Sequence, residues 1–91
     1  MENTACTIYK KPGIYDGGGI KDDCLYIDSE ISGTDDFPDS ERHYRLSKDE
    51  TAKLLSTITL DRFIELCKSE GLIGMEEFFN SNGITYSIDC F

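Results

Sequence analysis

Residues 24–31 read Cys-Leu-Tyr-Ile-Asp-Ser-Glu-Ile, and this stretch is the clearest strand in the chain. Its apolar and polar side chains alternate at period two, with Leu25, Ile27 and Ile31 on one face and Tyr26, Asp28 and Glu30 on the other. Residues 41–46, Glu-Arg-His-Tyr-Arg-Leu, alternate in the same way. The two segments predict an antiparallel hairpin with a long acidic loop, in which Arg42, His43 and Arg45 face Asp28 and Glu30 across the strands.

The chain before this hairpin is also extended in character. Residues 5–9 are β-prone and lead into a turn at Lys10-Lys11-Pro12-Gly13, after which residues 14–15 extend a second short strand. The triple glycine at 17–19 predicts a flexible turn or a hairpin tip. It does not predict a phosphate-binding loop, because no basic residue ends it and no helix follows it.

The second half of the chain changes to helical periodicity. Ser47-Lys48-Asp49-Glu50 is a capping box that predicts a helix start, and Thr59-Leu60-Asp61 predicts another. Gly71 is expected to end that second helix at its C′ position. A third short helix is expected from about residue 74 to residue 80, and residues 84–90 alternate as a closing strand.

This order of elements, strands first and helices second with one last strand, predicts an α+β domain. We expect a mainly antiparallel sheet of about four strands with two to three helices packed on one face. The 91 residues suffice for a single domain, residues 1–91, with a thin core.

Composition excludes several classes of protein. The chain is 38% hydrophobic and 30% charged, and no apolar run is long enough to cross a membrane. The first residues lack the basic and apolar regions of a signal peptide, so a cytoplasmic location is expected. The four cysteines, Cys6, Cys24, Cys67 and Cys90, are too widely spaced for a zinc site and are expected to be buried free thiols.

The charge distribution is the strongest functional signal. The net charge is −9, and the window from residue 22 to residue 41 holds eight acidic residues without a single lysine or arginine. The ten acidic and nine basic residues elsewhere nearly cancel. A field of one sign attracts basic proteins and repels nucleic acid and anionic membranes, so neither of these two is an expected partner.

The sequence contains elements of two kinds of chemical site, a cysteine nucleophile and a calcium-binding loop. A cysteine nucleophile would need a base or a positive field beside it, and the single histidine, His43, is expected on an exposed strand face. A partial EF-hand loop spans residues 28–39, with oxygen-bearing side chains at loop positions 1, 3, 5, 9 and 12 and Gly33 at position 6. Asp35 at position 8, Asp39 at position 12 and the β-like flanks depart from the calcium-binding pattern.

We therefore expect a small acidic protein that acts by stoichiometric binding, without catalytic residues, cofactor or bound metal. Its most concrete form is an inhibitor or immunity-type protein that mimics nucleic acid and covers the basic surface of a nuclease, a toxin or another nucleic-acid-handling protein. The expected partner-binding residues are Asp22, Asp23, Asp28, Glu30, Asp35, Asp36, Phe37, Asp39 and Glu41. The alternative is a calcium-binding module built on the loop 28–39.

Overall fold

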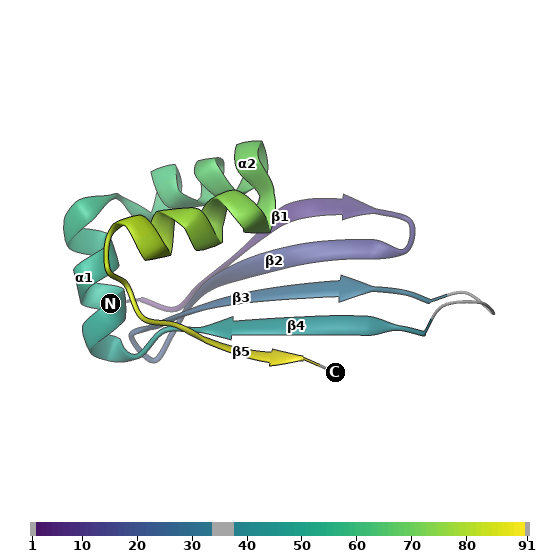
Figure 1. The fold of residues 1–91 in the computed structure, drawn as a ribbon, viewed down its shortest axis with the longest axis horizontal. Coiled ribbons are helices and arrows are strands. Elements are labelled where there is room, and N and C mark those ends of the chain that lie inside the picture. The colour runs from purple at the N-terminus through teal and green to yellow at the C-terminus, as the bar shows by residue number, and fades with distance from the viewer. Residues whose placement is uncertain (1, 34–37, 91) are drawn as a thin grey trace.

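The strands lie side by side in the order in which the chain makes them. A computed structural model describes residues 2–33 and 38–90. Its elements are β1 (Thr4–Lys11), β2 (Ile14–Lys21), β3 (Cys24–Ile31), β4 (Ser40–Arg45), α1 (Lys48–Thr57), α2 (Leu60–Ser81) and β5 (Ser87–Cys90). All four pairs of neighbouring strands are antiparallel, and both helices lie on one face of the sheet (Figure 1). The α+β class is confirmed, with five strands and two helices.

The glycine run is the main correction to the sequence-based prediction. Residues 17–19 form no turn; they lie in the middle of β2, buried between β1 and β3. A Cβ atom on Gly18 would lie 2.3 Å from the carbonyl oxygen of Tyr26 and 2.5 Å from Cδ1 of Ile27. Glycine is therefore required here by the close approach of β3 and not by a turn.

The turn between β2 and β3 instead uses two aspartates. Asp22 and Asp23 have φ values of 52° and 65°, which match the left-handed conformation that a two-residue type I′ hairpin needs. Aspartate tolerates this conformation better than most residues with a side chain. The Asp22 amide also donates to Asn3 Oδ1 at 3.0 Å, which fastens the turn to the segment before β1.

Both helices begin at the residues that the sequence predicted. Ser47 Oγ accepts from the Glu50 amide at 3.2 Å, and Thr59 Oγ1 accepts from the Arg62 amide at 3.3 Å. Gly71, with φ of 72° and ψ of −172°, interrupts α2 where the second helix was expected to end. The segment after Gly71 is helical at once, so the expected third helix is the second half of α2 and begins earlier than predicted.

The core lies between the helices and one face of β1, β2, β3 and β4, with Ile8 as the buried residue of β1. Its fully buried apolar residues are Ile20, Leu25, Ile27, Tyr44, Leu54, Phe63, Cys67, Met75 and Phe79. Phe63 stacks on Phe79 with ring centroids 5.6 Å apart. The buried hydroxyl of Thr51 accepts a hydrogen bond from the Leu25 amide at 2.9 Å, which fixes α1 against the start of β3.

The helices cover only part of the sheet. In Figure 1 they lie over the end that carries the β2–β3 turn, and the opposite end extends beyond them. We call this opposite end, where β1 meets β2 and where β3 and β4 join, the distal end. The molecule is accordingly elongated, with extents of 44 × 24 × 21 Å. Among the described residues, neither helix combines the length and the apolar character needed to cross a bilayer.

Substitution of Gly18 tests the close approach of β2 and β3. We expect Gly18→Ala to lower the free energy of unfolding by about 1–3 kcal/mol, since the added methyl group meets backbone and a buried isoleucine. Lys21→Ala, an exposed change in the same strand, is the control and should stay within about 0.5 kcal/mol. Chemical denaturation measures both, and equal effects would contradict the packing argument.

The left-handed turn is tested at Asp22. Asp22→Val should lower the free energy of unfolding by about 1–2 kcal/mol, because a β-branched side chain is strained at positive φ. Asp22→Asn removes the same charge but tolerates the conformation, so its effect should be within about 0.5 kcal/mol. If the two variants are equally stable in chemical denaturation, the turn does not hold this conformation in solution.

Candidate functional site

The face of the sheet opposite the helices, called the open face below, is the candidate site. Because side chains alternate along a strand, the residues between the buried positions of β3 point away from the helices. The register aligns them in three rows across the sheet, which we number from the β2–β3 turn toward the distal end. The first row is Ala5, Gly19, Tyr26, Arg45 and Ser87, the second is Thr7, Gly17, Asp28, His43 and Asp89, and the third is Lys10, Tyr15, Glu30 and Glu41.

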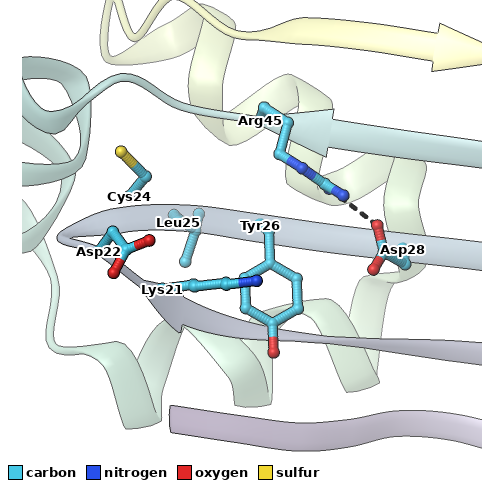
Figure 2. A pocket seen from close by; sticks show the side chains of 7 residues that line it. All are labelled: Lys21, Asp22, Cys24, Leu25, Tyr26, Asp28 and Arg45. Carbon is cyan, nitrogen blue, oxygen red and sulfur yellow. Dashed lines mark hydrogen bonds and ion pairs between the residues drawn. The ribbon is translucent and has the colours of Figure 1, made fainter. Parts of the chain in front are cut away.

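Two tyrosines on this face have a glycine as a neighbour: Tyr15 lies over Gly17, and Tyr26 is opposite Gly19. A Cβ atom on Gly17 would lie 2.4 Å from Tyr15 Oη and 2.7 Å from its Cζ, so the phenol occupies the space of the missing side chain. Tyr26 extends across β2 toward β1, and its hydroxyl donates to the Thr4 carbonyl oxygen at 3.4 Å (Figure 2). The open face therefore has no side chain at positions 17 and 19, next to the two aromatic rings.

Asp28 is the centre of an ionic cluster in the second row. Its Oδ1 accepts from His43 Nδ1 and from Arg45 Nη1, each at 2.8 Å, and Figure 2 shows the contact with Arg45. Glu41 Oε2 lies 3.4 Å from the other ring nitrogen of His43. The predicted contact of the hairpin bases with Asp28 is confirmed for His43 and Arg45. It is wrong for Arg42, which aligns with Ser29 on the helix side of the sheet.

These contacts shift the protonation of both partners. The hydrogen bond to Asp28 raises the pKa of His43, and Glu41 adds to the effect, since carboxylates at both ring nitrogens favour the imidazolium. Partial burial pushes the pKa of Asp28 upward. The hydrogen bonds from His43 and Arg45 outweigh this effect and hold the pKa below its usual range. At neutral pH, Asp28 is therefore charged and paired with the Arg45 guanidinium.

The structure distributes the predicted acidic residues over three places. Asp22 and Asp23 form the β2–β3 turn, and Asp39 lies next to β4 at the distal end, where its Oδ1 accepts from the Gly33 amide. The residues that share the open face are Asp28, Glu30 and Glu41. Asp35, Asp36 and Phe37 lie outside the described residues. The hairpin is also not the edge of the sheet, because β5 pairs with β4 on its outer side.

The open face carries both signs of charge at each end, with Lys10 in the third row toward the distal end. Lys21 and Arg45 lie near the β2–β3 turn, with Tyr26 and Asp22, around a hollow of about 500 Å³ (Figure 2). Toward the distal end, Glu30 lies directly opposite Glu41 across the strands. Like charges in this position destabilise a sheet pair, and no cation is in contact with Glu30 among the described residues.

The loop proposed for calcium does not have an EF-hand frame in its described part. Residues 28–31 belong to β3 and β4 follows the loop, whereas an EF-hand loop is flanked by helices. Asp28, the first position of that loop, is bound by His43 and Arg45. Across residues 2–33 and 38–90, no three histidine, cysteine or acidic side chains are grouped closely enough to hold a metal ion.

The cysteines are less uniformly buried than expected. Cys67 is buried, Cys6 and Cys24 are half-buried, and Cys90 is exposed on β5, so the expectation of burial is wrong for Cys90. Burial raises the pKa of the Cys67 thiol to about 12 and also raises that of Cys6. Neither of these two thiols is primed to form a thiolate nucleophile near neutral pH.

Sequence reasoning missed three residues of the open face: Tyr15, Gly17 and Asp89. Tyr15 and Gly17 are two residues apart, a spacing that would have placed them on one face if the strand had been continued through the glycines. Asp89 alternates with Ile88 and Cys90 in the closing strand and could have been assigned to the polar side.

Comparison with known proteins adds no family. No protein-family model, curated protein or solved structure gives a significant match to this chain. The function must therefore be inferred from the site itself.

The ionic cluster predicts a defined pH dependence. The pKa of His43 should lie above its usual value of about 6.5, as measured by NMR titration of the imidazole, and Asp28→Asn should lower it. His43 then stabilises the fold fully below pH about 6.5, and this contribution is lost as the pH rises through the raised pKa. Asp28 contributes above its usual pKa, and this contribution is lost as the pH falls through its lowered one.

Asp28→Asn should also lower the free energy of unfolding at neutral pH by about 1 kcal/mol, since the hydrogen bonds are charge-assisted but partly solvated. Glu65→Gln, which breaks the exposed contact with Lys68, is the control and should have a smaller effect. A His43 pKa at or below 6.5 in the wild type would contradict the cluster.

Proposed function

We propose that this protein acts by stoichiometric binding, as a cytoplasmic inhibitor or immunity-type protein. Its partner is a basic protein, such as a nuclease or toxin, whose nucleic-acid-binding surface the acidic hairpin covers. The contact surface is the part of the open face where Glu30 and Glu41 share the third row with Tyr15 and where Asp89 ends the second row on β5.

The observation that supports this proposal is the cross-strand pair of Glu30 and Glu41, in which Glu41 contacts His43 but Glu30 contacts no cation among the described residues. Arg45 pairs with Asp28, whereas no cation of the described residues contacts Glu30, which lies opposite a second glutamate. Two like charges opposite each other do not stabilise the sheet, whereas a basic partner would gain from them. The open face also has no helix over it, so its acidic residues are accessible to a protein surface (Figure 1).

A binding role without catalysis agrees with the states of the reactive groups. His43 contacts the carboxylates of Asp28 and Glu41, and the raised pKa values of Cys6 and Cys67 oppose thiolate formation. No observation favours calcium binding by residues 28–39, and this alternative stays a prediction.

The proposal is tested by removing charge from the open face. A triple variant, Glu30→Gln, Glu41→Gln and Asp89→Asn, should lose its basic partner in affinity capture from cell extract. With the purified partner, the wild-type protein should bind at a ratio of one to one and more weakly as salt increases, and the variant should bind at least about tenfold more weakly. Isothermal titration calorimetry measures both ratio and affinity.

The control removes the same number of charges from the helices, with Glu65→Gln, Glu70→Gln and Glu77→Gln. These residues are exposed on α2, away from the open face. The control should keep the affinity within about twofold, because only the long-range field changes. Equal capture of every partner by the wild-type protein and the open-face variant would refute the proposal.

A further inference from the structure

The side chain of Tyr15 is partly exposed on the open face. Tyr15 is 37% exposed, with its phenol end over Gly17. It makes no hydrogen bond or ring contact with another described residue. Three other tyrosines differ: Tyr26 has a guanidinium over its ring, and Tyr44 and Tyr86 pack against each other. One side of the Tyr15 ring therefore lies against the sheet at Gly17, and the other side is accessible to solvent.

The same face already shows what such a ring can bind. The Arg45 guanidinium carbon lies 5.6 Å from the ring centroid of Tyr26, and Nη1 of the same arginine donates to Asp28 at 2.8 Å. One guanidinium thus contacts a tyrosine ring and a carboxylate together. Both interactions favour arginine, whose planar cation stacks on aromatic rings and pairs with carboxylates through several donors.

The third row repeats the ring and the carboxylate but has no guanidinium. Tyr15 lies opposite Glu30, and Glu30 lies opposite Glu41. The basic residue of this row, Lys10, stands on the other side of Tyr15, in β1. A guanidinium placed above Tyr15 would reach toward Glu30 and reduce the repulsion between Glu30 and Glu41. Arg45 similarly pairs with the carboxylate of Asp28 in the neighbouring row.

We propose that Tyr15 is the residue on which an arginine side chain of the basic partner stacks, with Glu30 and Glu41 pairing its charge. This inference rests on the proposed function and makes it more specific. The partner is recognised by a planar guanidinium and not by positive charge alone, so that an arginine-rich surface is preferred over a lysine-rich one.

The test uses two defined probes, hexa-arginine and hexa-lysine peptides, titrated into the full chain at low ionic strength. The wild-type protein should bind hexa-arginine about three- to fivefold more tightly, the range expected for an exposed cation–π contact. Tyr15→Leu should lower this ratio by about twofold or more and weaken hexa-lysine binding less, since the ring favours the guanidinium. Tyr15→Phe keeps a ring and should keep most of the preference.

The matched control is Tyr9→Leu. Tyr9 is 46% exposed, but it aligns with Asp16 on the helix side of the sheet, so its loss should leave the ratio unchanged. A measurement on the wild-type protein avoids any dependence on variant folding: hexa-arginine should shift the NMR signals of the Tyr15 ring more than those of Tyr9.

The outcomes separate the two proposals. Equal affinity of the wild-type protein for the two peptides, or a preference that Tyr15→Leu leaves undiminished, would overturn the role of Tyr15. The acidic surface would still stand in that case if Glu30→Gln with Glu41→Gln weakened both peptides. Unchanged binding of both peptides by that double variant would refute the proposed function itself.

Discussion

The close packing of β2 between β1 and β3 is the constraint on which the rest of the molecule depends. It leaves no room for side chains at Gly18 and Gly19, although glycine loses more backbone freedom on folding than any other residue. On the helix side, Gly18 leaves room for Ile27 and the β3 backbone. On the other side, Gly19 leaves room for the β1 backbone at Thr4, and Gly17 leaves room for the Tyr15 ring. One short segment thus shapes both the core and the open face.

The two faces of the sheet meet different physical demands. The helix side buries Leu25, Ile27 and Tyr44 beneath α1 and α2, and the hydroxyl of Thr51 joins the two layers. The open face has no such cover and is organised by cross-strand pairs. At its centre these pairs are complementary, as between Asp28 and His43, while at the distal end Glu30 and Glu41 repel each other. A basic protein would supply the positive charge that Glu30 lacks among the described residues.

Much of the fold could be predicted, because local patterns and tertiary packing agree there. The alternation of residues 24–31 and 41–46, the caps at Ser47 and Thr59, and the break at Gly71 each follow from backbone hydrogen bonding or from left-handed φ. The glycine run could not be placed in this way. Local propensity favours a turn for three glycines, and only the proximity of β3 explains why they continue a strand.

For the candidate site, the sequence by itself determined the charge of the hairpin and the polarity of each strand face. Composition and the alternation of side chains along a strand do not depend on which strands pair. Only the tertiary structure decided which charges meet. Register placed His43 and Arg45 on Asp28 but turned Arg42 to the other side, and it moved Asp22 and Asp23 to the far end of β3 from Glu30. It also brought Tyr15 beside Glu30, from strands whose pairing depends on how the whole sheet packs against the helices.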